Sequence, residues 1–157
     1  MRKLLVFVIL IIFYSCKATK VDFYLPENFE GEAAMIYIAD GNTPIYKNDR
    51  QQVFVPDSAV IFINKKFNEG QTDLCYYIKN KNGYSKLEMY YPGMVIEKDK
   101  TYIFFERILS FYLDIKNEEP IIGHFFYVGK QLDTTVARQR FFFENKIENL
   151  LKSRKNS

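Results

Sequence analysis

The chain has 157 residues, a formal net charge of +3, a single histidine and two cysteines, and 17% of its residues are aromatic. Its length is typical of one domain, and its charge is too small to indicate a nucleic-acid partner. One histidine excludes the usual zinc sites, and the sequence contains no phosphate-binding loop, dinucleotide fingerprint or nucleophile elbow, so we expect no metal, no cofactor and no catalytic residue.

The N-terminal segment has the parts of a bacterial lipoprotein signal. Two basic residues come first, an apolar run follows over Leu4–Tyr14, and a small residue precedes Cys16. The apolar run is shorter than the roughly 20 residues that a membrane-spanning helix needs. We therefore predict a cleaved signal peptide over residues 1–15 and a diacylglycerol on the thiol of Cys16. An ordinary secreted protein is the alternative, because Phe13 and Tyr14 stand where a lipobox usually has Leu and a small residue.

The predicted anchor also places the protein in the cell. Two or three acyl chains hold a protein firmly on a membrane, so the membrane is the first expected partner, through the lipid at Cys16. Residues 16–20 form a short lipidated tether that contains no acidic side chain. Lipoproteins sent to the cell surface often carry acidic residues there. We therefore predict a cell-envelope protein in the outer membrane that faces the periplasm.

Short apolar runs separated by turn residues fill the region 21–132, which we assign to one β domain. Gly, Pro, Asn and Asp interrupt the runs at short intervals, a pattern typical of antiparallel β structure. Tyr and Phe are prominent in the runs, and both favour half-buried pleated surfaces. We predict a mainly β fold, an antiparallel β-sandwich-like domain. The expected strands are Val21–Leu25, Ala33–Ala39, Val53–Val55, Ala59–Ile63, Leu74–Ile78, Leu87–Tyr91, Tyr102–Phe105, Ile108–Ile115 and Ile121–Val128.

A hairpin is predicted at Asn82-Gly83, because this dipeptide favours a tight turn between paired strands. Tyrosines gather on both sides of the turn. Their rings can stack on a sugar or anchor a protein partner, and cross-strand aromatic pairs also stabilise a sheet without any ligand. We expect sheet support. The first surface to test for contact with another envelope protein or a glycan comprises Tyr76, Tyr77, Tyr84, Tyr90 and Tyr91.

Glu106 is the most unusual polar residue, because it interrupts a long apolar stretch. Burial at this position would raise its pKa and make it a candidate acid, working with a second carboxylate. A hairpin tip at Glu106-Arg107, between two strands, explains the residue more simply. We expect the hairpin tip.

The remaining candidate residues have simple structural explanations. His124 lies in a strand-like run, where we expect a satisfied or edge-exposed histidine rather than a catalytic one. Cys75 also lies in an apolar run, and we expect a small buried side chain with no disulfide partner once Cys16 carries lipid. Asp40-Gly41-Asn42 with Asn48-Asp49 lacks the ligand spacing of an EF-hand loop, so turn chemistry is expected there.

A helix is predicted near the end of the chain. Asp133-Thr134-Thr135 can cap it, and apolar residues recur at helical spacing within Val136–Ser153. We expect this helix, assigned to residues 133–153, to pack on one face of the sheet and to precede a disordered tail over residues 154–157. Phe141-Phe142-Phe143 is wider than one apolar stripe, so a core position is expected and a partner surface is the alternative.

Three short segments follow a common pattern. In Phe23–Gly31, an aromatic residue is followed by Leu-Pro-Glu, and a second aromatic residue and a Gly come after it. In Val53–Ser58, an aromatic residue is followed two positions later by a proline. In Phe125–Lys130, aromatic residues are followed by Val-Gly. These segments resemble an uncharacterised family of small bacterial lipoproteins and secreted domains, although Ser58-Ala59 stand where that family usually has Gly. The family has no assigned activity. The resemblance implies a compact β domain behind a lipoprotein or secretion signal.

Together these patterns predict a lipid-anchored, non-enzymatic binding or structural accessory module of the cell envelope. Two alternatives stay open. One is an envelope hydrolase that uses Glu106. The other is a small inhibitor or immunity-type lipoprotein, since such proteins are small, anchored and free of catalytic motifs.

Overall fold

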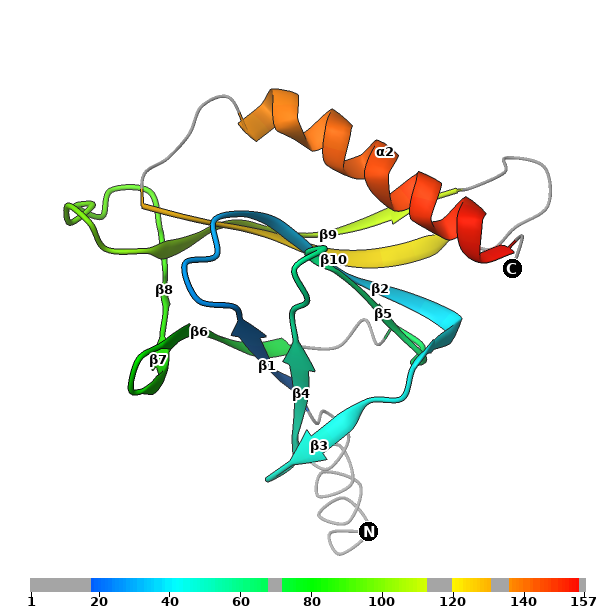
Figure 1. The fold of residues 1–157 in the computed structure, drawn as a ribbon, viewed down its shortest axis with the longest axis horizontal. Helices are drawn as coiled ribbons and strands as arrows, with labels where there is room; N and C mark the ends of the chain where they lie inside the picture. The colour runs from blue at the N-terminus through cyan, green and yellow to red at the C-terminus, as the bar shows by residue number, and fades with distance from the viewer. Residues whose placement is uncertain (1–17, 68–71, 113–119, 131–135, 156–157) are drawn as a thin grey trace, which may run out of the picture.

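The computed structural model describes residues 18–67, 72–112, 120–130 and 136–155. These residues form two β-sheets that face each other, and one helix lies on the outer face of the second sheet (Figure 1). The prediction of a mainly β, sandwich-like domain with a C-terminal helix is therefore confirmed. The signal peptide and Cys16 lie outside the described residues.

The first sheet, here called sheet A, has its N-terminal strand β1 at the centre. The strand order is β3-β4-β1-β6-β7, and β1 runs parallel to both of its neighbours. The prediction of purely antiparallel pairing is thus wrong in this sheet. Between β1 and β4, and again between β4 and β6, the chain passes through a strand of the other sheet. Each of these three strands can therefore run in the same direction. The strands are β1 (Thr19–Leu25), β3 (Ile45–Lys47), β4 (Arg50–Phe54), β6 (Thr72–Asn80) and β7 (Gly83–Lys86).

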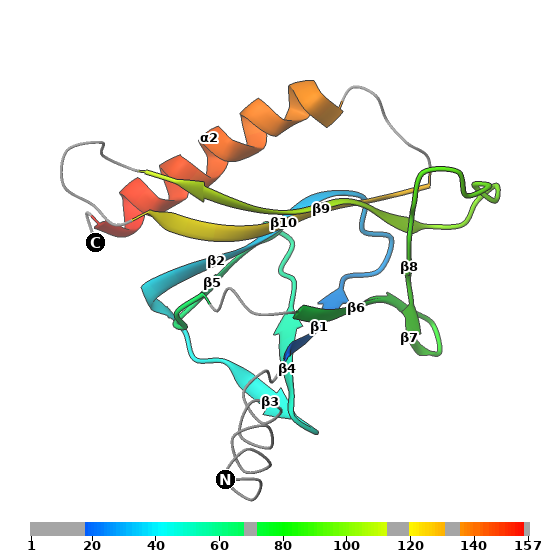
Figure 2. The same cartoon turned by 180° about the vertical axis from the view of Figure 1, so that it is seen from behind.

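The second sheet, here called sheet B, is also mixed. Its order is β5-β2-β10-β9-β8, with antiparallel pairing of β10 to both β2 and β9 and parallel pairing at each edge. Helix α2 (Val136–Lys155) crosses the outer face of this sheet (Figure 2). The strands are β2 (Gly31–Asn42), β5 (Val60–Ile63), β8 (Glu88–Met89), β9 (Tyr102–Phe111) and β10 (Ile121–Gly129).

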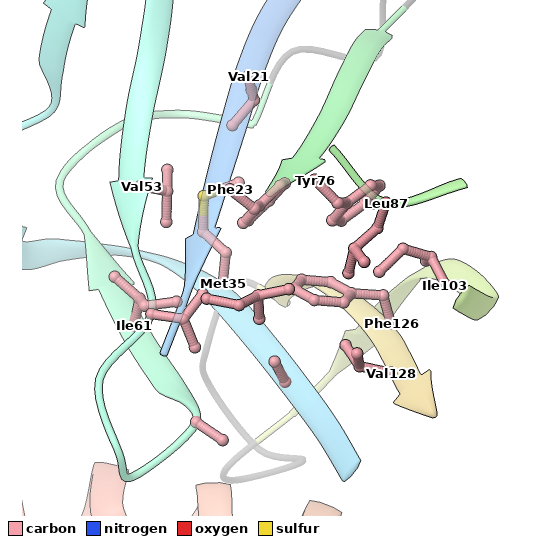
Figure 3. Packing of buried hydrophobic residues seen from close by; sticks show 14 of the residues in the cluster. Val21, Phe23, Met35, Val53, Ile61, Tyr76, Leu87, Ile103, Phe126 and Val128 are labelled. Atoms are coloured by element: carbon pink, nitrogen blue, oxygen red, sulfur yellow. The ribbon is translucent and has the colours of Figure 1, made fainter. Parts of the chain in front are cut away.

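The main hydrophobic core fills the space between the two sheets. Aromatic rings from both sheets meet there: Phe23 of β1, Tyr76 of β6 and Phe126 of β10 are each at most 2% exposed (Figure 3). Phe126 lies 5.0 Å from Phe23 and 4.8 Å from Tyr76, measured between ring centroids. Because burial of apolar area is the dominant favourable term in folding, this aromatic cluster holds the two sheets together.

A second, smaller core lies between sheet B and α2. Ile147 and Leu151 of the helix are buried there against Ala34 and Phe125 of the sheet, and Leu150 packs against the same cluster. The predicted packing of the helix on one sheet face is confirmed at these residues. The side chains of the three consecutive phenylalanines in the helix lie outside the described part of the structure.

The boundaries of two predicted segments need correction. Thr19 and Lys20, expected in the tether, already belong to β1. Arg154, expected in a disordered tail, belongs to α2, and its guanidinium donates a 2.8 Å hydrogen bond to the carbonyl of Asp40 and lies over the ring of Phe62. The β domain therefore begins closer to the predicted lipid attachment point than the sequence indicated.

The predicted hairpin is confirmed as the β6–β7 connection, with Lys81-Asn82 at its tip, one residue before the expected centre at Asn82-Gly83. Asn80 pairs with Gly83 across the turn, and the backbone N–H of Asn82 donates a 2.8 Å hydrogen bond to the side-chain oxygen of Asn80. Gly83 has a φ of 124°, which a residue with a Cβ rarely adopts. The turn chemistry thus fixes the register of this edge of sheet A.

Candidate functional site

The outer face of sheet A, which points away from sheet B, carries a row of aromatic side chains. Side chains alternate across a strand, so the neighbours of the core residues Phe23 and Tyr76 point outward. The row follows four adjacent strands, and we call it the aromatic stripe. Its members are Phe54 of β4, Tyr24 of β1, Tyr77 of β6 and Tyr84 of β7.

The rings of the aromatic stripe stack on one another. The Tyr24 ring lies 4.9 Å from the Phe54 ring and 5.2 Å from the Tyr77 ring, with interplanar angles of 19° and 15°. Tyr84 meets Tyr24 edge-on, with 5.0 Å between centroids. Because β1 lies between β4 and β6, both faces of the Tyr24 ring are covered.

Exposure distinguishes the ends of the aromatic stripe from its middle. Phe54 is 52% exposed and Tyr84 is 46% exposed, whereas Tyr24 and Tyr77 are half-buried. Within the described residues no helix or strand covers this face (Figures 1 and 2). A row of large apolar side chains on an open sheet face is typical of a protein contact surface.

An ion-pair network lies on the same face, nearer the start of β1. The Arg50 guanidinium donates to Asp22 and to Asp73, with both distances at 2.6 Å, and so ties β4 to β1 and β6. The hydrogen bond from Arg50 lowers the pKa of the Asp73 carboxyl below its usual range. This network fixes the spacing of three of the four strands that display the stripe, namely β4, β1 and β6.

Cys75 lies on this outer face and not in the core. It is half-buried, has a free thiol, and sits opposite Asp22 in the β1–β6 register. The expectation of a buried cysteine is therefore wrong. The core position belongs to its neighbour Tyr76, because successive side chains of a strand point to opposite faces.

The structure separates the five tyrosines that the sequence grouped. Tyr77 and Tyr84 belong to the aromatic stripe, but Tyr76 is 2% exposed and lies in the core, where no partner can reach it. Tyr90 packs on Phe104 of sheet B with 5.1 Å between ring centroids, and Tyr91 is exposed in the connection that follows β8. The sequence analysis missed two members of the stripe, Tyr24 and Phe54. They are brought together by the parallel pairing of β1 with β4, which leaves no signal in the spacing of residues along the sequence.

The second candidate region is a polar cluster inside the core. The Tyr76 hydroxyl lies 3.2 Å from Nε2 of His124, and the same nitrogen lies 3.5 Å from a carboxylate oxygen of Glu106. Phe23 and Phe126 pack against the imidazole, with centroid distances of 5.6 and 6.2 Å. Residues from β6, β9 and β10 thus bring their polar atoms together between aromatic rings.

Glu106 reaches this cluster because of a β-bulge. The expected hairpin tip at Glu106-Arg107 is wrong, since β9 continues through both residues. The register of β9 on β10 shifts between Phe125 and Tyr127, and Phe105 takes a positive φ of 49°. An extra residue in one strand re-aims the side chains beside it. The bulge therefore turns the Glu106 carboxyl towards His124 while the Phe105 ring stays exposed.

Burial controls the protonation of the polar cluster. Burial lowers the pKa of His124 to about 4, so the imidazole is neutral at pH 7. Burial also raises the pKa of Glu106, and the hydrogen bond from the Tyr76 hydroxyl opposes this rise. The pKa of Tyr76 is raised by burial and by the nearby Glu106 carboxylate, so its hydroxyl stays protonated. The cluster is a hydrogen-bonded set of mainly neutral groups.

Of the two segments expected to form turns, only one does so. Asn48 and Asp49 form the β3–β4 turn with positive φ angles. Asp40-Gly41-Asn42 instead lies at the end of β2, where the Asp40 carboxylate is 3.4 Å from the guanidinium of Arg154. No group of three or more metal-ligating side chains occurs among the residues that the structure describes.

Comparison with known proteins finds a likeness in fold alone. No protein-family model and no curated protein matches the chain, so the resemblance drawn from Phe23–Gly31 stays a prediction. A similar solved structure is that of a Bacillus anthracis protein described as a "Putative Lipoprotein". The TM-score is 0.54 at 15% sequence identity, over 84% of this chain and 96% of that chain. This chain is therefore similar in fold, over most of its length, to that Bacillus anthracis protein.

Proposed function

We propose that this protein is a lipid-anchored, non-enzymatic binding module of the cell envelope that contacts another envelope protein through the outer face of sheet A. The observation that carries the proposal is the aromatic stripe, which ends in two exposed rings, Phe54 and Tyr84. Large aromatic side chains are the commonest energetic anchors of protein interfaces. The Arg50 network on the same face keeps β4, β1 and β6 in register.

Ring geometry favours a protein partner over a glycan. A sugar stacks on an open ring face, but the faces of Tyr24 are covered by Phe54 and Tyr77. The middle of the stripe is therefore closed to stacking, and the two exposed end rings, Phe54 and Tyr84, suit the apolar centre of a protein interface.

The polar cluster supports a structural rather than a catalytic role for its residues. Glu106, His124 and Tyr76 direct their polar atoms at one another, and aromatic rings pack against the imidazole. The groups beside Glu106 in this cluster are the Tyr76 hydroxyl and the His124 imidazole, whereas the hydrolase alternative requires a second carboxylate. A buried polar set of this kind specifies one arrangement of the core.

The lipid anchor is supported by the signal pattern that ends at Cys16 and by a neighbour of similar fold that is described as a lipoprotein. No helix within the described ranges is long and apolar enough to cross a bilayer. On this proposal the acyl chains at Cys16 hold the domain at the periplasmic surface of the outer membrane.

The anchor is tested by metabolic labelling. Cells that express the full chain are given a clickable fatty acid, and the labelled protein is detected after purification. We expect label on the wild-type chain and none on a Cys16→Ala variant. Cys75→Ala is the matched control and should keep the label. A Cys16→Ala chain that still carried lipid would overturn the anchoring part of the proposal.

The contact surface is tested by removing the two exposed rings of the aromatic stripe. Each aromatic anchor at the centre of an interface contributes about 2 kcal/mol, so losing one corresponds to roughly 30-fold in affinity. We expect the Phe54→Ala/Tyr84→Ala variant of the full chain to lose capture of an envelope protein that the wild-type chain retains. The measurement is quantitative mass spectrometry of the captured proteins, followed by the Kd of the purified partner.

The control for this experiment is Tyr91→Ala, which removes a ring that is 60% exposed but lies outside the stripe. This variant should bind like wild type. Equal capture by the double variant and by wild type would contradict the proposed surface. Retention of cell-wall sugar in place of a protein would support the glycan alternative, and a captured enzyme that loses activity would identify an inhibitor.

A further inference from the structure

The edge strand β3 (Ile45–Lys47) is exposed along its whole length. Ile45 is 58% exposed and Tyr46 is 56% exposed, and they point to opposite sides of the sheet. Figure 1 and Figure 2 both place β3 at the end of the molecule opposite to α2. Large apolar side chains exposed on an unpaired sheet edge mark a candidate contact surface.

The register of sheet A places this edge beside the start of β1. Gln51 of β4 pairs with Val21 on one side and with Tyr46 on the other. Tyr46 is therefore two strands away from β1, or about 10 Å at the usual strand spacing. The β3–β4 turn lies at the same end of the sheet as Thr19, where β1 begins.

The chain that leads to the lipid is short. Cys16 precedes Thr19 by three positions, and three residues of extended chain span at most about 10 Å. A lipid on Cys16 therefore keeps the start of β1 close to the lipid headgroups. The side of sheet A that contains Thr19 and β3 must then be the side nearest to the bilayer.

The side chains at this edge suit a bilayer surface. Tyrosine rings favour the headgroup region of a membrane, where the ring is shielded and the hydroxyl stays wet. The ammonium of Lys65 lies 5.8 Å from the centre of the Tyr46 ring, and Lys47 lies next to it on β3. Lysine side chains extend along apolar surface and keep their charge at the headgroups. The nearby carboxylates are that of Asp49, in the turn that follows, and those of Asp22 and Asp73, which pair with Arg50.

We propose that the membrane edge, defined as Ile45, Tyr46, Lys47 and Lys65, rests on the headgroups of the bilayer that holds the lipid on Cys16. This inference deepens the proposed function and depends on its lipid anchor. With this edge on the bilayer, the seven-residue strand β1 rises away from the membrane. The exposed ends of the aromatic stripe then stand clear of the lipid and free for a protein partner.

A second pair of exposed apolar side chains, away from β3, serves as the control for the membrane edge. Tyr91 and Val95, in the connection after β8, are 60% and 85% exposed. Figure 1 places this connection on a different side of the molecule from β3. It follows strand β8, which pairs with the start of β9 in sheet B, so the short tether does not bring it to the bilayer.

The test uses the absence of tryptophan from the chain. Tyr46→Trp and Tyr91→Trp each introduce one fluorescent probe at similar exposure. The full lipidated chain is reconstituted into vesicles of phosphatidylcholine and phosphatidylglycerol, with or without bromine on the acyl chains, which quenches nearby indole emission. We expect emission from the Tyr46→Trp variant to shift to shorter wavelength and to lose intensity in brominated vesicles. Emission from the Tyr91→Trp variant should not change.

A second probe guards against local disturbance by the first. Ile45→Trp lies on the other side of the same strand and should be quenched as well. Equal quenching of the β3 probes and the Tyr91→Trp probe, or no quenching of either β3 probe, would overturn the membrane edge. Fatty-acid labelling of the same samples separates the two proposals. If the label is present without β3 quenching, only this inference fails, whereas absent label removes the anchor itself.

Discussion

A Phe23→Ala variant is expected to lose about 3–5 kcal/mol of unfolding free energy, the usual cost of removing a large aromatic side chain from a core. Phe23 is fully buried on the central strand of sheet A. Its ring stacks on Tyr76 at 5.1 Å and contacts Phe126 at 5.0 Å, so it joins the two sheets directly. Urea unfolding followed by circular dichroism measures the loss.

Phe54→Ala is the matched control for this prediction. Like Phe23→Ala, it removes a phenylalanine ring from sheet A, but from the outer face, where the ring is 52% exposed. We expect this variant to lose no more than about 1 kcal/mol, because a surface aromatic pair contributes about that much. Similar losses for Phe23→Ala and Phe54→Ala would contradict the placement of the core between the sheets.

Acidification is expected to destabilise the protein through His124. Its pKa is about 4 in the folded state, against an ordinary value of 6.5. Between these values the unfolded chain binds a proton that the folded protein excludes, so the unfolding free energy falls as the pH drops from 6.5 towards 4. The full pKa difference corresponds to about 3 kcal/mol. Urea unfolding at a series of pH values measures this loss.

Variants separate the contribution of His124 from that of its neighbours. Glu106 acts in the opposite direction, because its raised pKa lowers the unfolding free energy as the pH rises. His124→Phe should show a flatter decline between pH 6.5 and pH 4 than wild type, and Glu106→Gln a steeper one. Parallel curves for wild type and His124→Phe would show that the imidazole is not buried in its neutral form.

Local patterns in the sequence predicted most elements of this fold. Asn82-Gly83 located a hairpin because its backbone preference needs no tertiary contact. The helical spacing of Ile147 and Leu150 identified the helix that packs on sheet B. Apolar runs such as Val21–Leu25 and Ile121–Val128 lie within strands. These signals depend on neighbours a few residues apart.

The parts that sequence reasoning missed depend on contacts between distant segments. Tyr24 joins Phe54 and Tyr77 only because β1 pairs in parallel with β4 and β6. Glu106 meets His124 and Tyr76 only through a bulge that shifts the β9–β10 register. A polar pair such as Glu106-Arg107 in an apolar run has the same local pattern in a turn and in a bulged strand, so the sequence alone favoured the commoner one.

The central position of β1 also determines how the domain would carry a load. A pull on an anchor at Cys16 would act along β1, which hydrogen-bonds to a parallel neighbour on each side. Inter-strand hydrogen bonds run across the strand, so both ladders would be strained in shear and would have to fail together. An edge strand pulled sideways would instead separate one bond at a time. The strand that follows the predicted lipid attachment point is thus the one whose pairing best resists a force along the chain.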